Sequence, residues 1–92
     1  LASARRPHLT VHLPRELQVE RIFHEGVQRK GDDLQLDLPD LNAGATGVVI
    51  VRCRLAPRAY EPINVRAELS FGSATTKRQE TVTTQTTLQV EG

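Results

Sequence analysis

Apolar and polar residues alternate along most of this chain, and that period of two is the feature that most constrains its fold. The longest alternation places five apolar side chains on one side of an extended segment: Ile63, Val65, Ala67, Leu69 and Phe71. Residues two apart share a face of a β-strand, whereas an amphipathic helix needs apolar residues three and four apart. The pattern therefore predicts strands in preference to helices.

Further segments show the same alternation, namely residues 9–13, 17–23, 34–38, 48–55 and 82–90. In the segment 17–23 the apolar residues occupy odd-numbered positions, namely Leu17, Val19 and Phe23. Ile22 is the exception, because it occupies an even-numbered position. A β-bulge near Ile22, or a second buried face, explains such a break. A helix over residues 14–25 is the alternative for this segment, because its apolar residues also fit one helical stripe.

Turn-forming residues separate these segments. The sequence predicts a tight hairpin turn at residues 30–33, a second turn at residues 42–44, and a hairpin tip at residues 72–76. Residues 56–62, with two prolines, are expected to be a connection. Short alternating segments between regular turns predict an all-β fold, an immunoglobulin-like antiparallel sandwich of six or seven strands.

The chain has 92 residues, which suffices for a single domain. We expect residues 1–7 to form a flexible N-terminal lead and residues 8–92 to form the sandwich. Because the chain begins with Leu1 instead of Met, we interpret it as a fragment of a longer protein. No segment approaches the roughly 20 apolar residues of a membrane-spanning helix, so no membrane span is predicted.

Charge and cysteine content exclude several classes of function. Twelve basic and eleven acidic residues leave a net charge of +1, whereas nucleic-acid binders usually carry a strong basic patch. Aromatic residues make up 3% of the chain, which leaves no platform for stacking bases, so no nucleic-acid partner is expected. The single Cys53 rules out an internal disulfide, and it favours the cytoplasm over the cell surface or periplasm.

The residues that could carry chemistry do not form a recognisable site. His8 and His12 are four apart, which on a strand separates them by about 13 Å, too far to share one metal ion. Asp32 and Asp33 suit a turn better than a calcium site. Cys53 lies on the apolar face of its strand, where burial raises a thiol pKa and makes it inert. We therefore predict no catalytic, cofactor-binding or metal-binding residue, and no enzymatic activity.

Three segments occur in a distinctive order: residues 8–22, residues 31–44 and residues 48–55. A strand ending in Leu13-Pro14 precedes a hairpin, the Asp-Leu-Asn-Ala-Gly turn of residues 40–44, and an apolar strand. This order resembles the small β-sandwich module that follows the von Willebrand factor A domain in many bacterial proteins. The resemblance implies an accessory sandwich that packs on, or spaces, a neighbouring adhesion-type domain. The Asp-x-Ser-x-Ser metal motif of the A domain is absent from this chain, so no metal ligand is carried over.

The segment at residues 48–55 begins with apolar residues of both parities. We expect the odd-numbered residues of this segment, such as Val49, to join Leu69 in the core. The even-numbered residues form the candidate interaction surface, which consists of Val48, Ile50, Arg52 and Arg54. Burial of Val48 and Ile50 under a loop of the same domain is the alternative, and simple solvation is the alternative for the two arginines.

The sequence thus predicts a non-catalytic structural or protein-interaction module whose partner is a neighbouring domain or another protein. Free strand edges and exposed apolar area give such a sandwich the means to bind. A sandwich that binds carbohydrate or another small ligand through its loops is the alternative. Sugar binders present exposed Trp or Tyr, and here Tyr60 is the residue available for stacking.

Overall fold

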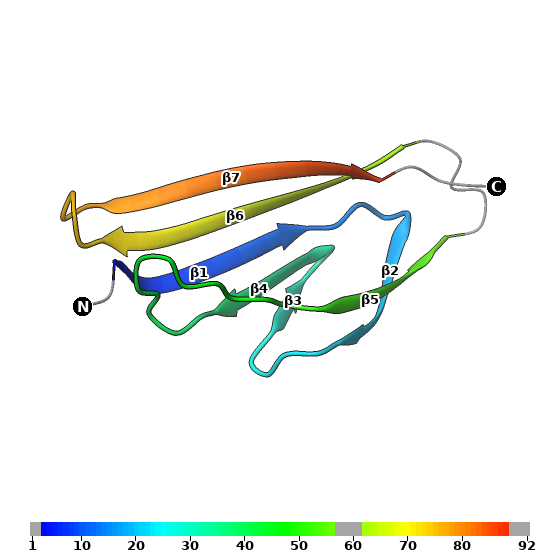
Figure 1. Ribbon diagram of the computed structural model, residues 1–92. Helices are drawn as coiled ribbons and strands as arrows, with labels where there is room; N and C mark the ends of the chain where they lie inside the picture. The colour runs from blue at the N-terminus through cyan, green and yellow to red at the C-terminus, as the bar shows by residue number, and fades with distance from the viewer. Residues whose placement is uncertain (1–2, 57–61, 89–92) are drawn as a thin grey trace.

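The computed structural model describes residues 3–56 and 62–88, which form seven β-strands and no helix (Figure 1). The strands are β1 (Ala4–His12), β2 (Leu17–Ile22), β3 (Gln28–Lys30), β4 (Asp33–Asp37), β5 (Val51–Leu55), β6 (Ile63–Ser73) and β7 (Gln79–Leu88). The all-β class and the antiparallel sandwich predicted from the alternation are confirmed. The described residues therefore include no helix that could cross a membrane.

The strands form two sheets of unequal size. The larger sheet has five strands in the order β3-β4-β1-β6-β7, and the smaller contains only β2 and β5. Every pairing is antiparallel. Figure 1 shows the long β6–β7 hairpin running along the whole molecule, with β2 and β5 in a separate, shorter layer. Among the described residues, the two strands of the smaller sheet are too few to cover all five strands of the larger one.

The alternating residues of the central strands meet on the inner face of the larger sheet. Leu9 of β1 lies opposite Leu36 of β4 and Leu69 of β6, and Val11 lies opposite Leu34. Only three hydrophobic residues of the described chain are fully buried: Leu34, Leu36 and Ile63. Leu69 and Val49 face the interior as expected, but they are half-buried. The compact core is thus small and centred on β4.

The first strand begins earlier than the sequence analysis predicted. Residues 4–7 belong to β1, where Ala4 pairs with Ser73 of β6, so they are not a lead to the domain. The register shifts between Arg5 and His8, and Arg6 adopts a positive φ of 49°. This bulge interrupts the alternation, which explains why the sequence pattern missed the start of the strand. Residues 1–2 lie outside the described residues.

The predicted turns occur where glycine allows a left-handed backbone. Gly31, with φ of 62°, lies in the β3–β4 hairpin, and Gly44, with φ of 79°, lies in the turn after residue 41. The Ala45 N–H closes that second turn by donating to the Asn42 carbonyl at 3.0 Å. The β6–β7 tip spans residues 74–78, slightly later than predicted. Of the connection expected at residues 56–62, residues 57–61 lie outside the described residues.

The broken parity in residues 17–23 comes from a β-bulge, and the helical alternative is wrong. β2 pairs with β5, and its register shifts between Val19 and Arg21, so Glu20 is the extra residue. Beyond the bulge, Ile22 lies opposite Val51 of β5, and the Phe23 N–H donates to the Ile50 carbonyl at 2.9 Å. The strand expected over residues 48–55 is shorter, because β5 begins at Val51.

Candidate interaction surface

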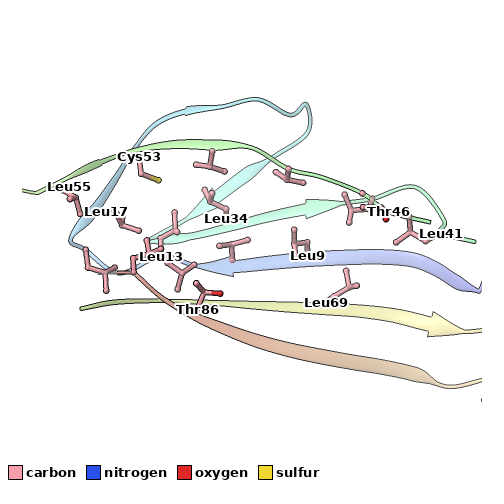
Figure 2. A pocket seen from close by; sticks show the side chains of 18 of the residues that line it. Leu9, Leu13, Leu17, Leu34, Leu41, Thr46, Cys53, Leu55, Leu69 and Thr86 are labelled. Carbon is pink, nitrogen blue, oxygen red and sulfur yellow. The ribbon is translucent and has the colours of Figure 1, made fainter. Parts of the chain in front are cut away.

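An open apolar groove separates the two sheets. Its volume is about 1040 Å³, and it is lined largely by leucine, valine and isoleucine side chains from both sheets. Figure 2 shows Leu9, Leu34 and Leu69 of the larger sheet facing Cys53 and Leu55 of the smaller one. Protein interiors are normally packed without voids of this size. The groove is therefore an accessible surface and not a filled core.

The groove stays open because the residues around it are too few and too small to fill it. Only β2 and β5 face a sheet of five strands. On the inner face of β7, Thr86 and Leu88 line the groove, and no aromatic side chain of the described residues does so. Phe23, the aromatic residue closest in sequence to β2, lies on the other side of the small sheet. Val82 and Leu88 on this face of β7 are accordingly exposed.

The four residues predicted as an interaction surface are all exposed: Arg52 and Arg54 on the outer face of β5, and Val48 and Ile50 in the segment that leads into it. Val48 and Ile50 expose 73% and 59% of their surface. Arg52 and Arg54 of β5 are also exposed, whereas the alternate residues Val51 and Cys53 line the groove. The alternative that a loop of this domain buries Val48 and Ile50 does not hold for the described residues.

Phe23 also belongs to this outer face, although the sequence analysis grouped it with the buried parity. The bulge at Glu20 reverses the parity of the residues after it, and Phe23 is exposed as a result. Its ring centroid lies 4.7 Å from the guanidinium carbon of Arg21 and 5.5 Å from that of Arg52. Both distances are within cation–π range. The adjacent Ile22 and Phe23 were the sequence signal for this reversal.

We define the outer patch as Phe23, Val48, Ile50, Arg52 and Arg54. Arg54 is oriented by Glu20, whose Oε1 lies 2.8 Å from Arg54 Nε. This pair is largely exposed, so it contributes at most about 1 kcal/mol to stability. Arg21 lies beside Phe23, so the patch and its immediate neighbours carry three guanidinium groups, of which Arg54 is paired with the Glu20 carboxylate. The patch therefore combines exposed apolar area with a positive rim.

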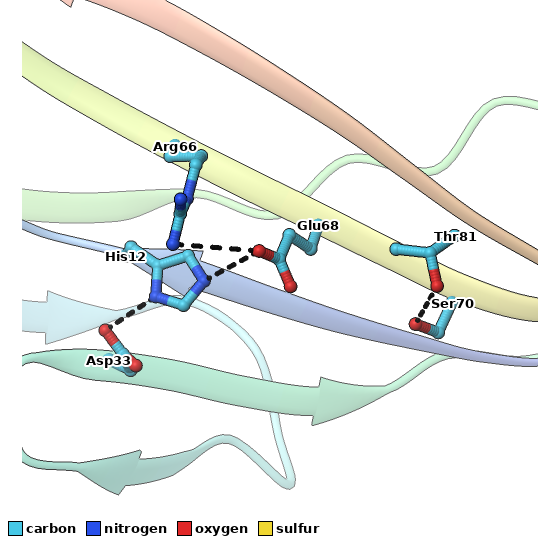
Figure 3. A network of polar contacts seen from close by, with 6 residues as sticks. All are labelled: His12, Asp33, Arg66, Glu68, Ser70 and Thr81. Carbon is cyan, nitrogen blue, oxygen red and sulfur yellow. Dashed lines mark hydrogen bonds and ion pairs between the residues drawn. The ribbon is translucent and has the colours of Figure 1, made fainter.

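The outer face of the larger sheet is polar and has a different character. His12 Nδ1 lies 3.0 Å from Asp33 Oδ1, and His12 Nε2 lies 3.4 Å from Glu68 Oε1, which Arg66 also approaches (Figure 3). His8 has a separate partner, Asp37, at 2.8 Å. The two histidines thus form separate cross-strand pairs. In residues 3–56 and 62–88 no group of three or more His, Cys, Asp and Glu residues could hold a metal ion.

Cys53 lies on the groove side of β5. Burial raises the pKa of its thiol, and the nearby negative charge of Glu20 raises it further. The direction agrees with the sequence analysis, although the residue is only half-buried. A raised pKa leaves less of the nucleophilic thiolate at any given pH below it. Cys53 is therefore a groove-lining apolar group and not an activated nucleophile.

This pKa shift predicts slow alkylation of Cys53. At pH 8 we expect iodoacetamide to react several-fold more slowly with the folded chain than with the chain in urea, and the pH profile of the rate to lie at higher pH when folded. Glu20→Gln should increase the folded rate modestly, because burial is the larger cause. Equal pH profiles for folded and unfolded chains, corrected for the effect of urea with a free thiol, would contradict the assignment.

The chain matches no protein-family model, no curated protein and no solved structure. A proposal about its function therefore rests on the surfaces of the structure. Around β5, Val51 and Cys53 face the groove, whereas Val48 and Ile50, which precede the strand, are exposed to solvent.

Proposed function

We propose that this protein is a non-catalytic interaction module that packs against a neighbouring domain or another protein through the outer patch. One observation supports this: the segments next to the two-stranded sheet, Phe23 after β2 and Val48 and Ile50 before β5, expose large apolar side chains to solvent, whereas the inner face of the sheet meets another layer. An isolated two-stranded sheet is marginally stable in water. A partner that covered the outer patch would stabilise the sheet and remove apolar area from water.

The composition of the outer patch suits a protein partner. Fully burying a side chain such as Phe23, Val48 or Ile50 contributes roughly 1.5–3 kcal/mol. Aromatic and arginine side chains are also the residues that most often dominate binding energy at protein interfaces. The guanidinium groups of Arg52 and Arg54 favour a partner that has carboxylates around an apolar centre.

We further propose that the partner is a von Willebrand factor A domain in the same polypeptide. The support for this is the resemblance carried by residues 8–22, 31–44 and 48–55. In that arrangement the sandwich has a packing or spacing role, and the metal-binding chemistry belongs to the partner.

The thermal midpoint tests this proposal. We expect the midpoint of this sandwich to be higher when the adjoining domain of its natural polypeptide is attached than when it is alone. Ile50→Asp should abolish that gain and leave the isolated chain almost unchanged, because Ile50 is exposed. Gln28→Asp, which puts the same charge on the exposed β3, is the control. Equal midpoints with and without the neighbour would rule out a packing role.

The groove favours a second candidate, the binding of an apolar small ligand. Its volume of about 1040 Å³ lies near the upper end for small-molecule sites, and its lining is mostly apolar with a few polar groups such as Thr46 and Thr86. A sugar fits this lining poorly, because no aromatic ring lines it among the described residues. Tyr60, the stacking residue named from the sequence, lies outside the described residues.

A further inference from the structure

The four outer strands of the two sheets differ in how their free edges are protected. Unpaired edges invite pairing with another chain, and proteins usually block them with charges, bulges or short strands. β3 has only three residues, including Arg29 and Lys30. β2 contains the bulge at Glu20, and β5 carries Arg52 and Arg54. Each of these three strands thus has at least one protective feature.

β7 is the exception. It is ten residues long, pairs with β6 in a register without a shift, and has no other strand beside it among the described residues. From Thr81 to Leu88 it contains no charged residue and no proline. No backbone group of residues 80–88 bonds to any described residue outside the β6–β7 pairing. From Thr81 to Leu88, β7 therefore presents a regular and uncharged edge.

Side chains hold this edge firmly against β6. Ser70 Oγ and Thr81 Oγ1 form a hydrogen bond of 3.0 Å near one end, as Figure 3 shows. Near the other end, Thr87 Oγ1 donates to Asn64 Oδ1 at 2.8 Å. A strand ordered in this way loses little further conformational entropy when another strand pairs with it.

We propose that β7 pairs antiparallel with β7 of a second copy of this chain, about a two-fold axis at Gln85. In this register Val82 lies opposite Leu88 of the second copy, and Thr84 lies opposite Thr86. Val82 and Leu88 are the two large hydrophobic residues that β7 exposes, at 56% and 42%. They lie on the same face and at equal distances from Gln85, so the chain is complementary to itself at this edge.

Neighbouring registers match less well. An axis at Thr84 would place Glu80 opposite Leu88, and an axis at Thr83 would place Val82 opposite Thr84. Residues 82–88, which lie opposite one another in the register about Gln85, contain no charged residue, so this described part of the seam brings no like charges together.

The dimer joins the larger sheets of the two copies into one continuous sheet. An antiparallel pairing about an axis normal to the sheet keeps both groove faces on the same side, so the two grooves adjoin along the β7 seam. The outer patch lies on the small sheet and remains free. This self-association is therefore independent of the binding proposed for the outer patch, and either one can fail without the other.

Charge substitution at the axis tests the dimer by sedimentation equilibrium. We expect the wild-type chain to dimerise between about 10 and 500 µM. Gln85→Glu and Gln85→Lys should each weaken dimerisation about fivefold or more, because like charges then face each other across the axis. Mixing the two variants should restore association by pairing opposite charges. Gln85 lies on the solvent face opposite Arg66, so both variants should fold, and far-UV circular dichroism checks this.

Gln28→Glu on the β3 edge is the matched control and should leave dimerisation unchanged. A wild-type chain that stays monomeric at about 500 µM overturns the proposal. So does a mixture that associates no better than either variant alone, or a control that weakens dimerisation as much as Gln85→Glu does.

Discussion

Replacing Leu34 by alanine is expected to lower the free energy of unfolding by about 2–5 kcal/mol. Leu34 is 2% exposed and is the second residue of β4, opposite Val11. It is one of only three fully buried hydrophobic residues in the described chain, so few neighbours can compensate for the loss. A domain of this size is stable by only about 5–15 kcal/mol, and the variant should be substantially unfolded by modest heating.

Urea unfolding followed by far-UV circular dichroism measures this change. Val48→Ala is the control, because Val48 is exposed and its truncation should alter stability by less than about 0.5 kcal/mol. If the two variants lost similar stability, the small core centred on β4 would be wrong.

Leu69→Ala and Val49→Ala should cost less, about 1–2 kcal/mol. The alternating pattern predicts both residues in the core, where such truncations remove packing and leave a cavity. In the structure both line the open groove and are half-buried. The cavity term is therefore small, because solvent already reaches the space that the truncated side chain would vacate.

The folded chain is expected to bind an apolar fluorescent dye such as anilinonaphthalene sulfonate in the groove, with a large increase in emission. Val51→Gln should weaken dye binding about three- to tenfold, because it places an amide among the apolar side chains that line the groove. Ile50→Gln is the matched control: it makes the same kind of change one residue away, on the opposite face of the small sheet.

The two variants separate the groove from the outer patch as the site of binding. Equal loss of dye binding in both variants, or a greater loss in Ile50→Gln, would contradict the groove assignment. Repeating the titration with a medium-chain fatty acid by calorimetry tests the second candidate function, and an affinity lowered only by Val51→Gln would support it. Circular dichroism of both variants confirms that they remain folded.

The period-two alternation was sufficient to determine the class of fold. Residues such as Ile63, Val65 and Leu69 do lie on one face of β6, because a strand places every second side chain on the same side. The turns at Gly31 and Gly44 were also recognisable, since both require a positive φ that glycine adopts without strain. The outer face of Val48, Ile50, Arg52 and Arg54 followed from the same parity.

Two bulges limited what this parity could determine. The bulge before His8 concealed the start of β1, and the extra residue Glu20 turned Phe23 outward onto the candidate surface. A bulge adds one residue, which reverses the faces of everything after it, and nothing in the local sequence specifies which residue is extra.

By itself, then, the sequence determined that this chain forms antiparallel strands, where most of them turn, and which residues of β5 share a face. Only the tertiary structure decided that the layers are unequal, that a groove remains between them and that β7 ends the larger sheet. The physical reason is that alternation is a local property of each strand. Strand order and the space between layers depend on pairings between residues far apart in the chain, such as His8 with Ser70.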